Sequence, residues 1–166
     1  MDDLFGPFND LSEHYATKHF FGKDENLVPD RSKINPMLVN KLEEIYKFLD
    51  NQPEYKGKGF PLLGGYRSKN HPDERKKKVP GSHTHGIAAD VDVSQHGDIE
   101  KLYRLLDKQP FMKDTSLGVY PDGKSLHIDV RGKNFRWGAL KKANGDNEYL
   151  TADEAFRRFK SRKRVK

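Results

Sequence analysis

The sequence predicts an α+β domain in which helices flank a small, mostly antiparallel sheet. Three observations lead to this class: two segments with helical apolar periodicity, several short strand-like segments, and a tight turn joining two of them. At 166 residues the chain is long enough for one domain with a buried core. Hydrophobic and charged residues each make up 34% of it, so the core should be compact and the surface strongly charged.

The first helix is predicted to begin at Pro36, because Asn35 can cap it and proline suits the first helical position. Asp50-Asn51-Gln52-Pro53 then ends it. Between these signals runs one apolar stripe: Leu38, Leu42, Ile45 and Leu49. A second helix is predicted from Asp98-Ile99 onward. Its apolar residues are Ile99, Leu102, Leu105 and Leu106.

Four short segments are predicted as strands: Phe60–Leu63, Ile87–Val93, Ser116–Tyr120 and Ser125–Val130. The last two form a hairpin around Pro121-Asp122-Gly123-Lys124, whose Asp-Gly pair favours a turn. Residues 69–82 are polar and basic, as in a surface loop. Thr151 to Glu154 has the pattern of a capping box and opens a last short helix. We therefore expect one domain over residues 1–150, with residues 151–166 attached to it as a basic helix or tail.

Composition narrows the classes of protein. The chain has no cysteine, which excludes disulfides and a thiolate zinc site. No segment approaches the roughly 18 apolar residues of a membrane span. The acidic opening Met1–Gly6 lacks the layout of a secretory signal, so we expect a protein that is cytoplasmic as synthesised.

The net charge of +6 is unevenly spread, with basic runs at Arg75–Lys78 and Arg157–Lys166. Such runs favour anionic polymers: nucleic acid, membrane surfaces or cell-wall polymers. Phe159 is the only aromatic residue in the second run, which makes nucleic acid the weaker alternative. A solvated tail without a partner is equally compatible with this pattern.

Candidate metal ligands lie on two of the predicted strands and on the loop before one of them. His83 and Asp90 stand seven positions apart across a turn that contains Gly86, and His127 lies within the second strand of the hairpin. Two imidazoles and one carboxylate suit Zn²⁺ with a fourth position open, the arrangement of a catalytic zinc site. The two histidines could equally be ordinary polar residues that bind no metal. The pattern alone leaves both interpretations open.

Several ordered motifs resemble those of a known zinc peptidase family. They are Gly65-Tyr66-Arg67-Ser68 with Asn70, His83-x-x-Gly86-x-Ala88-Ala89-Asp90, Gly118-Val119-Tyr120-Pro121 and His127-Ile128-Asp129-Val130-Arg131. Together, over about residues 11–137, they are similar to the D-Ala-D-Ala carboxypeptidases and L-alanyl-D-glutamate endopeptidases, which share the hedgehog-like fold. The resemblance implies zinc bound by His83, Asp90 and His127, with Arg67 beside the metal to hold a carboxylate or an oxyanion. One departure is Gly81, where the family usually has a serine.

The general base is not defined by the resemblance, because Lys124 stands where many relatives have an acidic residue. Asp129 is the favoured candidate, since two positions beyond His127 on a strand it faces the same side. Its competing role is to orient a metal histidine or to pair with Arg131. Asp122, in the turn, is the second candidate base. His85 is the third.

The resemblance implies a zinc-dependent hydrolase of the peptides of bacterial peptidoglycan, acting as a monomer. Without a leader, such an enzyme would reach the wall after release, as a phage lysis enzyme or virion component does. The basic tail could then hold an anionic wall polymer. The alternative is a non-catalytic zinc module that binds the cell wall or a partner, favoured by Lys124 in place of an acid. A nucleic-acid binder is a third and weaker alternative.

Overall fold

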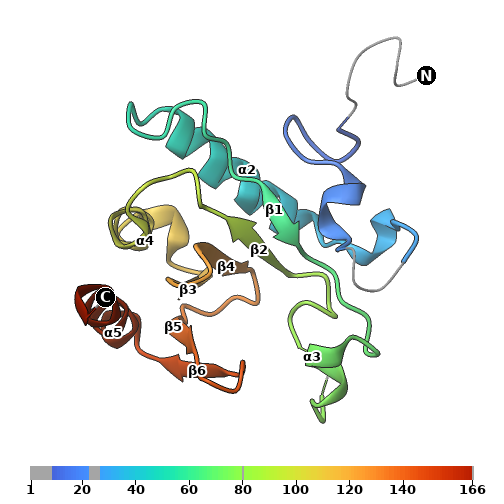
Figure 1. Cartoon of the computed structure of the whole chain (residues 1–166). Helices are drawn as coiled ribbons and strands as arrows, with labels where there is room; N and C mark the ends of the chain where they lie inside the picture. The colour runs from blue at the N-terminus through green and yellow to red at the C-terminus, as the bar shows by residue number, and fades with distance from the viewer. Residues whose placement is uncertain (1–8, 23–26, 80, 166) are drawn as a thin grey trace. The chain divides into compact units, whose positions relative to one another are not determined.

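The computed structural model describes residues 9–22, 27–79 and 81–165 (Figure 1). The opening Met1–Gly6, from which we predicted that no secretory signal is present, lies outside them.

Six strands form one sheet in the order β1-β2-β4-β3-β5-β6, and helices accompany it, which confirms the α+β class. The chain divides into two compact units, Met1–Ala89 and Asp90–Lys166. The predicted domain over residues 1–150, with its attached tail, stays a prediction.

The first unit contains the longest helix of the described chain, α2 (Pro36–Asp50). The Asn35 side chain accepts a hydrogen bond from the Met37 amide at 2.8 Å, so the predicted cap and start are both confirmed. The apolar stripe is fully inside the protein. Its members are Leu38, Leu42, Ile45 and Leu49, each at most 1% exposed. Local sequence signals and burial therefore specify the same helix.

The segment from Ser12 to Tyr15 is held against α2 by the buried carboxylate of Glu43. Glu43 accepts hydrogen bonds from the Ser12 hydroxyl and the His14 amide, both at 2.6 Å, and contacts the His14 ring at 2.8 Å. Burial raises the pKa of Glu43, but these hydrogen bonds outweigh it and hold the pKa below its usual value. The hydroxyl of Tyr15 donates to the carbonyl of Phe60. Polar contacts thus hold this aromatic segment in place.

Short elements complete the first unit: η1 (Thr17–Phe20), η3 (Arg31–Lys33), β1 (Leu62–Gly64) and α3 (Pro72–Arg75). Strand β1 begins two residues later than predicted. The amides of Gly65 and Tyr66, just after it, donate to the carbonyl of Phe20. Helix α3 interrupts the predicted surface loop over residues 69–82, because His71 caps its first turn by accepting from the Asp73 amide.

Strand β2 (Ala88–Asp92) leads into the second unit, whose hairpin is the predicted one. Strands β3 (Ser116–Tyr120) and β4 (Ser125–Asp129) pair antiparallel. In the turn between them, Lys124 adopts the left-handed conformation with φ 49°. The hairpin prediction is confirmed, and the residue in the left-handed region is Lys124, which follows the predicted Asp-Gly pair.

Two further strands add a parallel pairing, so the sheet is mixed, and its predicted mostly antiparallel character stays a prediction. Strand β5 (Arg136–Lys141) pairs parallel with β3, and β6 (Asn147–Leu150) pairs antiparallel with β5. The parallel pairing arises because the chain after β4 crosses to the far side of β3 before it forms β5. The amide of Leu117 starts this pairing by donating to the carbonyl of Phe135.

Helices α4 (Ile99–Asp107) and α5 (Ala152–Val165), with the short η4 (Pro110–Met112), accompany these strands. Helix α4 begins where it was predicted, and Asp98 caps it by accepting from the amide of Glu100. The Thr151 hydroxyl accepts from the amide of Glu154, which confirms the predicted start of α5. The buried ring of Phe156 meets the Tyr103 ring edge-on at 5.5 Å, so α5 packs against α4.

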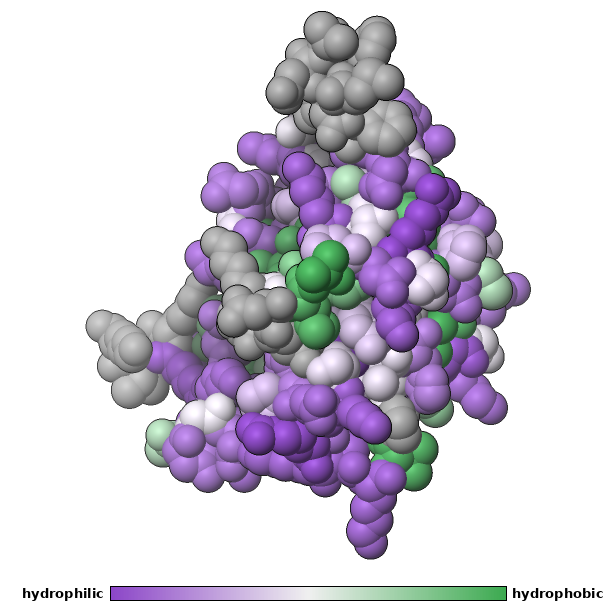
Figure 2. All heavy atoms as spheres, turned by 90° about the vertical axis from the view of Figure 1, so that its right-hand side faces the viewer, coloured by the Kyte–Doolittle hydropathy of each residue, from purple (hydrophilic) through white to green (hydrophobic). Residues whose placement is uncertain are grey.

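The surface is strongly polar, in keeping with a charged fraction of 34%. Hydrophilic side chains predominate on the face drawn in Figure 2, with a few apolar groups between them. Throughout the described ranges, every helix is too short or too polar to cross a lipid bilayer.

Candidate metal centre

His83 is a buried histidine whose ring orientation is fixed by a backbone carbonyl. Its Nδ1 lies 2.7 Å from the carbonyl oxygen of Gly65, and the residue is 5% exposed. Because a carbonyl oxygen can only accept, Nδ1 carries the hydrogen and Nε2 carries the lone pair. A second hydrogen bond of this kind is what orients most metal-binding histidines. His83 therefore has the tautomer of a ligand that binds through Nε2.

The turn after His83 depends on a glycine. Gly86 has φ 71°, and a Cβ at this position would stand 1.9 Å from the carbonyl oxygen of Lys33. Any other residue would therefore be strained in its backbone and would clash with another backbone segment. The Gly86 carbonyl also accepts from the amide of Asn35, so this turn is fixed against the start of α2.

Asp90 and His127 come from neighbouring strands, β2 and β4. The Asp90 Oδ1 lies 3.2 Å from the Nδ1 of His127. His127 is 5% exposed, and the Asp90 side chain is 15% exposed. This half of the centre is thus formed by adjacent strands, as the strand assignments predicted.

Asp129 lies behind His127 on β4 and is completely buried. Its Oδ2 is 3.1 Å from the Nε2 of His127, and its Oδ1 accepts from the amide of Arg131 at 3.1 Å. The Arg131 guanidinium also pairs with this carboxylate. Burial raises the pKa of Asp129, but the bonds to His127 and Arg131 outweigh it and hold the pKa well below its usual value. Asp129 is therefore an acceptor that orients His127.

These contacts define the chemistry of the His127 ring. An ionised Asp129 accepts the hydrogen on Nε2, so a neutral His127 has its Nδ1 lone pair directed at the Asp90 oxygen. Two acceptors 3.2 Å apart need a positive charge near them. Burial lowers the pKa of His127, but its bonds to Asp129 and Asp90 outweigh this and raise it. A proton or a metal ion satisfies this arrangement equally well.

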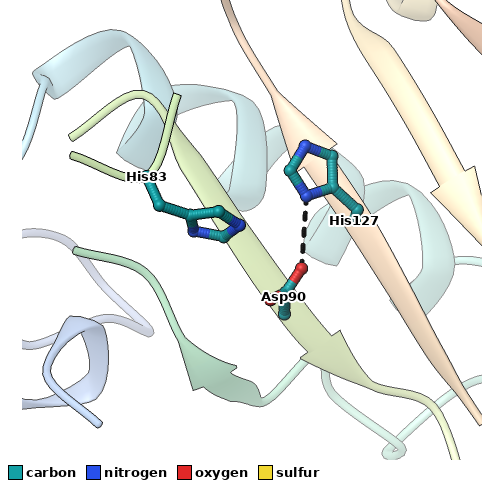
Figure 3. A group of neighbouring side chains, drawn as sticks. All are labelled: His83, Asp90 and His127. Carbon is teal, nitrogen blue, oxygen red and sulfur yellow. Dashed lines mark hydrogen bonds and ion pairs between the residues drawn. The ribbon is translucent and has the colours of Figure 1, made fainter. Parts of the chain in front are cut away.

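The three predicted ligands form one group in the structure. One ligand atom from each of His83, Asp90 and His127 lies within 4.8 Å of the other two. Figure 3 draws the three side chains, with the contact between Asp90 and His127 dashed. Two imidazoles and one carboxylate match the donors that Zn²⁺ takes in catalytic sites, which leave a coordination position open. The donor set therefore fits a divalent metal ion.

No known protein family, curated protein or solved structure matches the chain. The resemblance to zinc peptidases thus stays a prediction. Support for a metal centre comes from the donor set itself, and from the two partners, Gly65 and Asp129, that fix the tautomers of its histidines.

Arg67 lies beside His83 along the backbone. Its amide donates to the carbonyl of His83 at 3.3 Å, and its guanidinium is 3.8 Å from the carboxylate of Asp73. The side chain is 26% exposed. Ser68, next to it, accepts from the amide of Asn70 through its hydroxyl. The serine thus shapes the loop.

The departure at Gly81 has a structural counterpart. A Cβ there would stand 2.7 Å from the Nζ of Lys77 and 3.2 Å from a carboxylate oxygen of Glu74. Glu74 is 4% exposed, pairs with Lys77 at 3.1 Å and accepts from the Gly81 amide at 3.3 Å. This ion pair, in which the carboxylate is buried and the lysine is exposed, was not foreseen from the sequence. A serine at this position would require the Lys77 amine to move, and the bond from the Gly81 amide to Glu74 braces the loop before His83.

The other candidate bases lie in different surroundings. Asp122 accepts from the amide of Lys141 at 2.8 Å, so its carboxylate is bonded to β5. Lys124, which is not a candidate base but stands where many relatives have an acid, occupies the turn between β3 and β4 and is exposed. His85 is exposed two residues beyond His83, and its amide donates to the carbonyl of Gly81. Of these candidates, Asp129 is the one in contact with a predicted ligand.

Proposed function

We propose that the protein is a zinc-dependent hydrolase of peptide bonds in the stem peptides of bacterial peptidoglycan. The observation that supports this most strongly is the grouping of one donor atom each from His83, Asp90 and His127 within 4.8 Å. A zinc ion held by these residues supplies Lewis acidity toward a peptide carbonyl and an activated nucleophile near neutral pH. The substrate class itself rests on the motif resemblance.

Each of the two histidine ligands is oriented by a partner of its own. The Gly65 carbonyl keeps the Nε2 of His83 as the donor atom, and Asp129 keeps the Nδ1 of His127 as the donor atom. Both rings are therefore held in the required orientation before any ligand arrives, which reduces the entropy cost of binding. Arg131 keeps Asp129 ionised and so maintains the second of these contacts.

Arg67 is the residue proposed to hold the negative charge of the substrate. Its amide is hydrogen-bonded to the carbonyl of His83, and its side chain is 26% exposed. A guanidinium offers two parallel donors to a carboxylate or to the oxyanion of a tetrahedral intermediate. Arg67→Lys, which keeps the charge but loses the planar pair of donors, is expected to lower kcat/KM strongly while zinc stays bound.

Peptide hydrolysis also requires an acceptor for the proton of the nucleophile and a donor to the leaving amine. Asp129 is the first candidate to be tested as this base, and its contacts with His127 and Arg131 are those of a residue that positions the ring. The alternatives are Asp122, which is bonded to the Lys141 amide, and the exposed His85. Variants of these three residues separate a loss of turnover from a loss of metal.

The decisive experiment is the release of new amino groups from purified peptidoglycan. The protein is stripped with a chelator, one half is reloaded with zinc, and both halves are assayed beside the Asp90→Ala variant. The proposal predicts amine release only in the reloaded wild-type sample. Equal release with and without zinc, or none in any sample containing stoichiometric zinc, would contradict it.

A second candidate is a non-catalytic zinc module that binds the wall or a partner. It is favoured by the buried contacts of Asp129 and by Lys124 at the position of the usual acid, because together they leave no acidic side chain established as a base. This candidate predicts stoichiometric zinc and sedimentation with peptidoglycan without new amine ends. The amine assay above therefore distinguishes the two candidates.

The basic end of the chain is proposed to hold an anionic wall polymer. Helix α5 contains several arginines, of which Arg157 and Arg158 pair with Glu154. Such pairs at an exposed surface contribute little to stability and are easily exchanged for polymer anions. Sedimentation with isolated walls should weaken as salt rises. Retention on DNA that persists after deletion of residues 157–166 would count against nucleic-acid binding by this segment.

A further inference from the structure

Trp137 is the single tryptophan of the chain, and its indole lies flat on the sheet next to the candidate metal centre. Gly118 on β3 is opposite both His127 on β4 and Trp137 on β5. A Cβ on Gly118 would be 2.2, 2.3 and 2.6 Å from three consecutive indole atoms. Because these distances are nearly equal, that point lies over the ring face rather than beyond its rim. One face of the indole thus rests on Gly118.

Aromatic rings surround this indole on several sides. The His127 ring is 5.3 Å away and tilted by 49°, the Tyr120 ring is 5.3 Å away and nearly perpendicular, and the Tyr149 ring is 5.5 Å away. Tyr149, on the outermost strand β6, is 64% exposed. We call Tyr120, Trp137 and Tyr149 the aromatic platform. It extends the surface beside a metal ligand out to the edge of the sheet.

The three side chains of the platform favour a neutral occupant, and Lys141, exposed at the end of β5, adds a cation on that strand. None of its three side chains is charged at neutral pH, and the arginines on nearby segments already pair with acids of the same unit. These pairs are Arg131 with Asp129, Arg136 with Asp107, and Arg158 with Glu148. A nucleic acid strand needs cations for its phosphates beside the stacking rings. A neutral ring with apolar faces and a polar rim requires only the aromatic surface.

We propose that the aromatic platform is a subsite for a neutral pyranose ring of the glycan to which the stem peptide is attached. The C–H bonds on a pyranose face carry slight positive charge and stack on the negative face of an aromatic ring. Tyrosine hydroxyls beside the indole supply hydrogen-bond partners for the sugar hydroxyls. The choice of glycan rests on the proposed function. The contact between Trp137 and His127 places the platform beside the candidate metal centre, where the stem peptide would be cleaved.

The test uses the fluorescence of Trp137, which is free of interference because the chain has no other tryptophan. The full-length, zinc-loaded protein is titrated with a β-1,4-linked trimer of N-acetylglucosamine, which carries no peptide. A saturable change in emission is expected. Tyr149→Ala should raise Kd roughly 3- to 10-fold, as loss of one aromatic stacking partner implies. Met37→Ala, with a side chain of similar exposure on α2, serves as the matched control and should leave Kd unchanged.

A second variant acts on the platform from below. Gly118→Ala adds a methyl group where the indole now lies and should abolish the emission change, while zinc content, measured in parallel, stays at one per chain. The inference is overturned if the trimer leaves emission unchanged in the wild type. It is equally overturned if only a free stem peptide, or only a single-stranded oligonucleotide, changes the emission.

The outcome is independent of the amine-release assay. Sugar binding without amine release would leave the subsite in place and remove the hydrolase. Amine release without sugar binding would do the reverse.

Discussion

Asp129 is the residue at which the two proposed roles, base and positioning group, predict different results. Its carboxylate accepts the Nε2–H of His127, the amide of Arg131 and the Arg131 guanidinium. An asparagine offers one acceptor oxygen and one NH₂ donor group, so at least one of these donors would face another donor. Disturbing such a partner of a metal histidine costs about 10- to 100-fold in metal affinity, or about 1.4–2.8 kcal/mol. Asp129→Asn should therefore weaken zinc binding by this factor.

The assay is competition with a chromophoric zinc chelator at pH 7. Asp122→Asn is the matched control, because it changes a carboxylate of the same hairpin that is bonded to the Lys141 amide. The control should bind zinc as the wild type does. If Asp129→Asn retains wild-type zinc affinity but releases no amines from peptidoglycan, Asp129 is the proton acceptor and the positioning argument is refuted.

Three further variants test the frame around the site. Leu42→Ala, at a fully buried position of α2, should lower the free energy of unfolding by about 2–5 kcal/mol in urea titrations; a loss below about 1 kcal/mol would mean that the core closes over the gap. Glu43→Gln should cost about 1.5–3 kcal/mol at pH 7. Because the folded-state pKa of Glu43 is lowered, its contribution is present above about 4.5 and lost as pH falls, so the difference from wild type should shrink in acid. A difference that stays constant from pH 7 to pH 3 would show that the charge is not involved. Gly86→Ala should abolish zinc binding or folding, since the new Cβ would overlap the Lys33 carbonyl; a variant that binds zinc normally would mean that this turn does not position His83.

The helices could be predicted from the sequence because their signals are local. Asn35 and Pro36 start α2, and the apolar stripe has helical spacing, so no distant contact is needed to recognise the element. The start of α4 at Asp98 and the cap of α5 at Thr151 follow the same logic. Each of these three boundaries depends on a side chain that bonds to the backbone within three residues.

Strands β5 and β6 were missed, although a local signal was present. Asn144-Gly145 is a strong hairpin pair, and Gly145 has φ 89° in the turn between these strands. The parallel pairing of β5 with β3 has no local signal, because it depends on where the chain crosses after β4. The mixed character of the sheet therefore could not be predicted from strand patterns alone.

The ligand set was predicted from donor chemistry together with the motif resemblance, whereas the partners of the ligands depend on long-range contacts. Asp129 was foreseen as either a base or a partner of His127, and the contact with His127 is present. The roles of the Gly65 carbonyl and of buried Glu74 were not foreseen, since both arise from loops that meet only in the folded chain. The same holds for Trp137, whose position depends on the absence of a side chain at Gly118 across the sheet.

X-ray absorption at the zinc edge, on protein loaded with one equivalent of zinc, tests the central claim most directly. The account predicts a first shell of nitrogen and oxygen at about 2.0–2.2 Å with outer-shell scattering from two imidazoles. His83→Ala and His127→Ala should each remove one of them. A spectrum of fully hydrated zinc, or one that neither variant changes, would contradict the claim that these residues hold the metal.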